Sequence, residues 1–78
     1  MRLLIGKRSF PVVSLADASA RYQRFRGTKS SDVVPEGLVK DDAGQLVAKV
    51  SYNGRVWSPG PWHAGMAPLL EAVEVAGA

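Results

Sequence analysis

Residues 37–57 read GLVKDDAGQLVAKVSYNGRVW and predict three consecutive antiparallel strands. The strands are expected at Gly37 to Lys40, Gln45 to Tyr52 and Val56-Trp57. The first connection, Asp41-Asp42-Ala43-Gly44, begins with aspartate and ends with glycine, as β-turns commonly do. The second contains Asn53-Gly54, which predicts a type I′ hairpin with positive φ at both residues. These 21 residues therefore define an antiparallel meander.

The alternation of side chains along these strands indicates which residues face the core. On the central strand, Leu46, Ala48 and Val50 share one face because successive side chains point to opposite sides of a sheet. Val56 and Trp57 must likewise face opposite sides. We expect Trp57 to be the core residue, since its larger apolar area gains more from burial.

A helix is expected before the meander, from about Leu15 to Arg26. Ser14 and Asp17 have the spacing of a capping box at its start, and Gly27 offers a left-handed C-cap. The apolar positions fall on one stripe of the helical wheel. They are Leu15, Ala18, Tyr22 and Phe25. This stripe is the expected core face, packed across the sheet.

The N-terminal segment is expected to add two short strands, Arg2 to Ile5 and Ser9 to Val13, across a turn at Gly6-Lys7-Arg8. A single bent strand is the alternative. Pro11 lacks a backbone donor, so its strand should lie at a sheet edge.

The C-terminal segment has weaker signals. Pro68 could open a short helix, with Leu69, Leu70 and Val73 as its apolar face, and residues 75–78 are expected to fray. The chain is thus predicted to be one small α+β domain spanning residues 1–78, in the order ββαβββ, with that short C-terminal helix as an optional addition.

Composition narrows the class of protein. The 78 residues include no cysteine, and no apolar run approaches the length of a membrane span. We expect a cytoplasmic protein that does not enter a membrane. The single histidine, His63, has no visible catalytic or metal-binding constellation around it. The sequence predicts a protein that is not an enzyme, with no catalytic residues, metal, cofactor or small-molecule substrate.

Charge is distributed unevenly along the chain. Residues 1–29 hold seven Lys and Arg against one Asp, while the remainder holds three against six acidic residues. Clustered cations of this kind suggest an anionic partner. The candidate anion or nucleic-acid contacts are Arg21, Arg24, Arg26, Lys29 and Arg55. Intramolecular pairing is the alternative, because Asp17 and Arg21 have i, i+4 spacing and cations in a last turn complement the helix dipole.

One further pair of residues is a candidate contact for a protein partner. Trp62 and His63 lie in a segment rich in glycine and proline, flanked by Pro61 and Ala64. Trp62 is expected to be the more exposed of the two tryptophans.

Three stretches of the chain resemble a group of small uncharacterised bacterial proteins associated with mobile or phage-derived DNA. They are SLADASARYQRFR at 14–26, SDVVPEG at 31–37 and SYNGRVW at 51–57, and the resemblance covers most of residues 12–62. It implies a bacterial, intracellular setting and carries no activity or ligand. The meander is also similar in outline to the three-stranded DNA-reading sheet of many phage-type integrases, although such sheets carry more cations and here the helix precedes the sheet.

Two functions are consistent with these features. The first is a small non-enzymatic interaction module that binds a protein partner. The alternative is a nucleic-acid-binding accessory protein that uses its basic helix surface, and steep salt dependence of binding would distinguish it.

Overall fold

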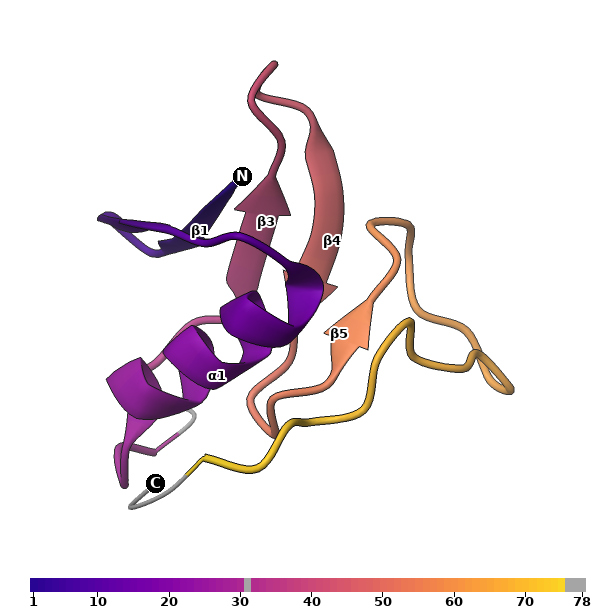
Figure 1. Ribbon diagram of the computed structural model, residues 1–78. Coiled ribbons are helices and arrows are strands. Elements are labelled where there is room, and N and C mark those ends of the chain that lie inside the picture. Colours follow the sequence, from indigo (N-terminus) through magenta and orange to yellow (C-terminus); the bar gives the residue numbers. More distant parts are fainter. Residues whose placement is uncertain (31, 76–78) are drawn as a thin grey trace.

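A computed structural model describes residues 1–30 and 32–75 of the chain (Figure 1). Its elements, in chain order, are β1 (Arg2–Ile5), β2 (Arg8–Pro11), α1 (Leu15–Arg26), β3 (Gly37–Lys40), β4 (Leu46–Val50) and β5 (Val56–Trp57). The predicted α+β class and the order ββαβββ are confirmed.

The strands form a single antiparallel sheet in the order β2-β1-β3-β4-β5. The N-terminal hairpin therefore joins the meander through β1, which pairs with both β2 and β3. The prediction of two N-terminal strands is confirmed, and the second begins and ends slightly earlier than expected. β2 is an edge strand, as predicted from Pro11, and one of its two sides has no neighbouring strand. The sheet therefore tolerates the backbone donor that Pro11 lacks.

The ends of α1 follow the local sequence signals. The Ser14 hydroxyl accepts a hydrogen bond from the Asp17 amide at 3.0 Å, and the Asp17 carboxylate accepts one from the Val13 amide at 2.9 Å. At the other end Gly27 has φ 54° and ψ −125°, and its amide donates to the carbonyl of Gln23 at 3.0 Å. Its φ is positive, as predicted, although its ψ differs from that of the left-handed helical conformation.

The helix packs on one face of the sheet, called here the inner face, and the core lies between them (Figure 1). The buried apolar residues are Leu3, Ile5, Val12, Ala18, Tyr22, Val34, Val39, Ala48, Val50 and Val56. On the predicted helix stripe, Ala18 and Tyr22 are fully buried, while Leu15 and Phe25 are half-buried at the margin of the core. The stripe is thus the core face, as expected.

Leu46 does not join Ala48 and Val50 in the core. The register of β3 and β4 shifts after Val39, so that Val39 lies opposite Ala48 but the next residue, Lys40, lies opposite Leu46. This irregularity turns Leu46 away, and its side chain is exposed.

Tyr22 is the largest side chain in the core, and its hydroxyl donates to the carbonyl of Pro35 at 2.8 Å. Burial disfavours the phenolate and raises the pKa of Tyr22 above its ordinary value of 10.0, against a smaller opposing effect of Arg26.

This shift predicts a loss of stability in alkaline solution. The folded protein keeps Tyr22 protonated at a pH where the unfolded chain has begun to release that proton. The contribution of the protonated Tyr22 to the free energy of unfolding is therefore complete below pH 10. It decreases as the pH rises from about 10 towards the pKa of Tyr22 in the folded state. Urea unfolding between pH 8 and 11 should show a steeper decline for the natural protein than for Tyr22→Phe. Parallel profiles for the two proteins would contradict this assignment.

The connection between β4 and β5 differs from the predicted type I′ turn. Among the described residues only glycines have positive φ, so Asn53 does not adopt the expected conformation, whereas Gly54 has φ 92°. The Ser51 amide donates to the Arg55 carbonyl at 2.9 Å, which leaves a three-residue loop. Asn53 instead uses its side-chain oxygen to accept from the Arg55 amide at 3.1 Å.

This longer loop reverses the predicted faces of Val56 and Trp57. A two-residue loop would place Trp57 opposite Val50, but the observed register pairs Val50 with Val56 and Lys49 with Trp57. A shift of one residue exchanges the two faces of a strand. Val56 is consequently the buried core residue, and Trp57 lies half-buried on the opposite face, called here the outer face. The expectation that Trp57 fills the core is wrong.

The short C-terminal helix is also absent from the described residues, which end at Val75. Leu70 forms a bridge with Val56, whose amide donates to the Leu70 carbonyl at 2.9 Å. Backbone pairing with β5 replaces the helix and covers the free edge of that strand. Val75 belongs to no helix or strand, and the rest of the predicted frayed tail lies outside the described residues.

Candidate functional site

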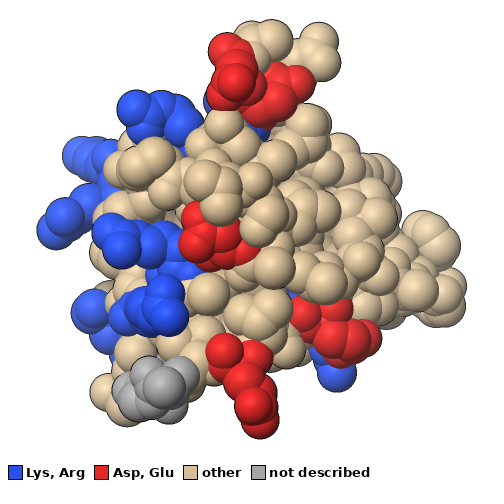
Figure 2. Space-filling view, viewed as in Figure 1, with Lys and Arg blue, Asp and Glu red and all other residues tan. Residues whose placement is uncertain are grey.

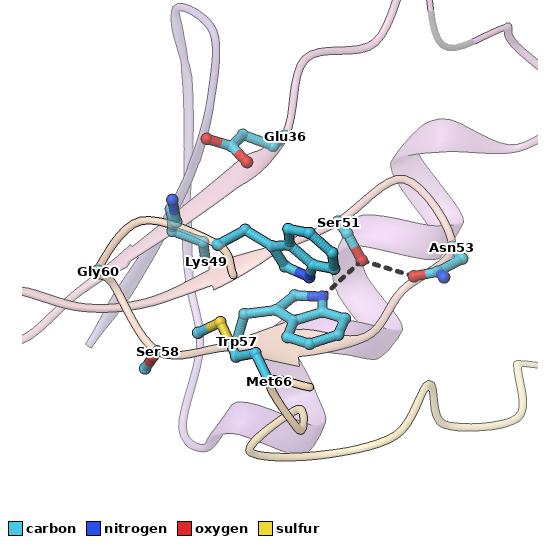
Figure 3. Close-up of a pocket in the computed structure, with 9 residues that line it drawn as sticks. Glu36, Lys49, Ser51, Asn53, Trp57, Ser58, Gly60 and Met66 are labelled. Carbon is cyan, nitrogen blue, oxygen red and sulfur yellow. Dashed lines mark hydrogen bonds between the residues drawn. The ribbon is translucent and has the colours of Figure 1, made fainter. Parts of the chain in front are cut away.

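The outer face of the sheet carries a hollow of about 260 Å³, called here the tryptophan hollow (Figure 3). Its lining residues come from β4, β5, the segments that flank these two strands and the residue that precedes β3. They are Glu36, Lys49, Ser51, Asn53, Trp57, Ser58, Gly60, Trp62 and Met66. Both tryptophans of the chain thus border one hollow, together with a methionine.

The pairing of β4 with β5 explains how these side chains come together. Ala48 and Val50 face the core, so the alternation along the strand turns Lys49 to the outer face. Lys49 lies opposite Trp57 in the ladder. Glu36 and Lys49 supply one charge of each sign to the lining, so the hollow has no formal net charge.

Hydrogen bonds hold the indole of Trp57 in place (Figure 3). Its Nε1 donates to the Ser51 hydroxyl at 3.0 Å, and that hydroxyl donates to the side-chain oxygen of Asn53 at 2.5 Å. The polar end of the indole is therefore satisfied inside the protein. Its apolar ring remains available to form one wall of the hollow.

Trp62 and His63, the two predicted partner contacts, have different surroundings in the structure. Trp62 lines the hollow and is 68% exposed, which confirms the prediction that it is the more accessible tryptophan. His63 is exposed but does not line the hollow, and its Nδ1 lies 3.2 Å from the carbonyl oxygen of Ala64.

On α1, Arg21 lies over an aromatic ring. The ion pair between Asp17 and Arg21, which was the alternative to anion binding, does not form. The Asp17 carboxylate accepts from the Val13 amide, and the Arg21 guanidinium lies 4.6 Å from the centre of the Phe10 ring. Lys29 is placed in the same manner, with Nζ 5.1 Å from the centre of the Phe25 ring. These cation–π contacts fix the direction of both side chains.

Three of the five predicted anion contacts donate hydrogen bonds within the protein, and the first is Lys29, whose Nζ donates to the Phe25 carbonyl at 3.2 Å. Arg26 donates from Nη1 to the Tyr52 carbonyl at 2.6 Å and lies over the Tyr52 ring. The Tyr52 hydroxyl in turn donates a hydrogen bond to the carbonyl of Lys29. Arg26 and Tyr52 thereby connect the C-terminal end of α1 to the β4–β5 turn. Arg55 donates from Nε to Glu71 at 2.9 Å. The five cations therefore do not form one site.

Sequence reasoning missed several residues of these surfaces. Lys49 and Ser51 could have been found, because they alternate with core residues of β4. The positions of Trp57 and Met66 in the hollow could not have been predicted, since they depend on the register of the β4–β5 loop and on the path of residues 58–70. Phe10 gave no sequence signal as a partner of Arg21.

The described part of the chain contains no group of three His, Cys, Asp or Glu side chains that could hold a metal ion. In that same part, no helix has the length and apolar character needed to cross a membrane.

No family model, curated protein or solved structure matches this chain.

Proposed function

We propose that the protein is a small non-enzymatic interaction module that binds a protein partner at the tryptophan hollow. The observation that carries this proposal is the 68% exposure of Trp62 beside a hollow that Trp57 and Met66 also line. Exposed tryptophan is unfavourable in water, and tryptophans that become buried on association are among the residues that contribute most to protein–protein affinity.

The size and charge of the hollow support a polypeptide as the ligand. Its volume of about 260 Å³ is below the range of about 300–1,000 Å³ typical of sites for small-molecule ligands. It suits one or two side chains of a partner. The opposite charges of Glu36 and Lys49 cancel, which favours an apolar segment of a protein over a polyanion.

A photo-crosslinking experiment tests this proposal. Trp62 is replaced by p-benzoylphenylalanine in cells that carry the protein naturally, and the cells are irradiated. We expect an adduct of discrete mass that resists nuclease, because the crosslinker occupies the place of the indole. A second substitution in the same chain, Met66→Ala, should reduce its yield several-fold by removing part of the lining.

The control places the crosslinker at Val13, which is 89% exposed and does not line the hollow. An adduct that nuclease removes, or an equal yield of the same adduct from position 13, would contradict a protein-binding role for the hollow.

A further inference from the structure

A second surface of the molecule is strongly basic. In Figure 2 the Lys and Arg side chains gather along one side, over the β1–β2 hairpin and α1, while most Asp and Glu lie elsewhere. The basic flank is defined here as Arg8, Arg21, Arg24 and Lys29, all exposed. Arg8 belongs to it because it precedes Phe10 by two residues on β2 and shares its face of the sheet.

The centre of the basic flank is a hollow of about 220 Å³ lined by Phe10, Arg21, Arg24 and Phe25. The two rings are in contact, with centres 5.7 Å apart and planes inclined by 58°. Arg21 lies over one ring and Lys29 over the other. The order is therefore cation, ring, ring, cation, built from an edge strand, one helix and the segment that follows this helix.

This arrangement prepares the cations for an anion. Contact with a ring restricts the rotamers of Arg21 and Lys29, so less side-chain entropy remains to be lost on binding. A guanidinium that lies over a ring keeps N–H donors in its own plane, where a phosphate can accept them. Arg21 and Arg24 are three residues apart on α1 and hence neighbours on its surface.

The same contacts indicate how a nucleic acid would be recognised. Sequence-independent binding of single strands depends on bases stacking on aromatic rings. Here the rings of Phe10 and Phe25 already carry cations, so the basic flank offers charge rather than stacking platforms. A duplex presents one negative charge per about 1.7 Å of its axis, which supplies a phosphate for each neighbouring cation.

We propose that the basic flank binds the phosphate backbone of double-stranded nucleic acid, through Arg21, Arg24 and Lys29, without reading the bases. This inference goes beyond the proposed function, because the tryptophan hollow lies on the outer face of the sheet and the basic flank on the inner face with α1. Arg26 is excluded from the contact set because it is half-buried and its guanidinium is held by Tyr52, and Arg55 because its charge is paired with Glu71. Lys29 donates to the Phe25 carbonyl at 3.2 Å, but it is exposed and its ammonium keeps two further N–H donors for a phosphate.

Binding to a labelled 20-base-pair duplex of mixed sequence, followed by fluorescence anisotropy from 20 to 200 mM salt, tests the proposal. Three phosphate contacts should give a slope of log affinity against log salt of about −2.7, at about −0.9 per contact. The double variant Arg21→Gln with Arg24→Gln should reduce the magnitude of the slope by about 1.8 and weaken binding at every salt concentration.

The matched control, Lys40→Gln with Arg55→Gln, removes the same number of charges outside the basic flank and should leave the slope unchanged. Phe10→Leu keeps every charge but removes the ring beneath Arg21. It should weaken binding about two- to fivefold, as loss of an exposed cation–π contact implies, with the slope retained. Thermal unfolding of each variant verifies that the proteins compared are folded.

Four outcomes would overturn the proposal. The first is no binding at 20 mM salt, and the second is a control variant that reduces the salt slope as much as the Arg21 and Arg24 variant does. The third is equal or tighter binding of a 20-nucleotide oligothymidylate. The fourth is displacement of the duplex by poly-glutamate as readily as by unlabelled duplex. None of them bears on the crosslinking result at Trp62, so the two proposals fail independently.

Discussion

Replacing Tyr22 by alanine is expected to lower the free energy of unfolding by about 4 kcal/mol, in the range seen for truncation of buried aromatic side chains. Tyr22 is fully buried in the core between α1 and the sheet, and its removal would leave a cavity there. A domain of 78 residues has a total stability of about 4–12 kcal/mol. The substitution is therefore expected to remove between about a third and all of the stability of the domain.

Urea unfolding followed by far-ultraviolet circular dichroism measures this effect. Tyr22→Phe is the control, because it keeps the ring and removes only the hydrogen bond to the Pro35 carbonyl. That bond contributes about 1 kcal/mol net. If Tyr22→Ala cost no more than Tyr22→Phe, the ring would not support the core and the packing of α1 described above would be incorrect.

Substitution of Gly54 by alanine is the second large effect, with an expected loss of about 3 kcal/mol. Gly54 has φ 92°, a conformation that residues with a Cβ rarely adopt. A Cβ at this position would also lie 2.7 Å from the side chain of Gln23. The substitution therefore combines backbone strain with a steric clash in a buried place.

The clash is severe because Gln23 has no room to move without breaking hydrogen bonds. Its Nε2 donates to the Val73 carbonyl at 2.8 Å and to the Ser19 hydroxyl at 3.2 Å. Ser19 in turn donates to the carbonyl of Gly54 itself at 2.7 Å. Ser19 and Gln23 are both buried, so any displaced polar group would lose its partner away from water.

Gly44→Ala provides a matched control. Gly44 has φ 84°, close to that of Gly54, but a Cβ at position 44 would meet nothing within 4 Å, so only the backbone strain remains. We expect this control to cost about 1 kcal/mol in chemical denaturation. Equal losses for the two substitutions would show that Gln23 yields freely and that the buried hydrogen bonds do not restrain it.

The local elements of this protein were predictable from neighbouring residues. Ser14 and Asp17 specify the start of α1 through hydrogen bonds that span three or four residues. The edge position of β2 follows from one missing donor at Pro11. Such features depend on interactions within a few residues, which is why patterns in the chain reveal them.

The candidate sites were less predictable, because each depends on contacts between distant segments. Arg21 could pair with Asp17 on its own helix, but the fold brings Phe10 of β2 against it. Arg26 and Arg55 belong to the same basic composition as Arg24, yet Tyr52 and Glu71 engage them. Composition counts charges and does not distinguish those with intramolecular partners from the others.

Trp57 shows most directly where the information in the sequence ends. Alternation by itself determined that Val56 and Trp57 face opposite sides of the sheet. It did not determine which side each one faces, because that depends on whether the turn at Asn53-Gly54 contains two residues or three. The tertiary structure decided this: the buried hydrogen bond from Ser19 to the Gly54 carbonyl and the pairing of Val56 with both Val50 and Leu70 select the three-residue loop. The indole is thereby placed on the outer face, where the tryptophan hollow forms, because a shift of one residue in register exchanges core and surface.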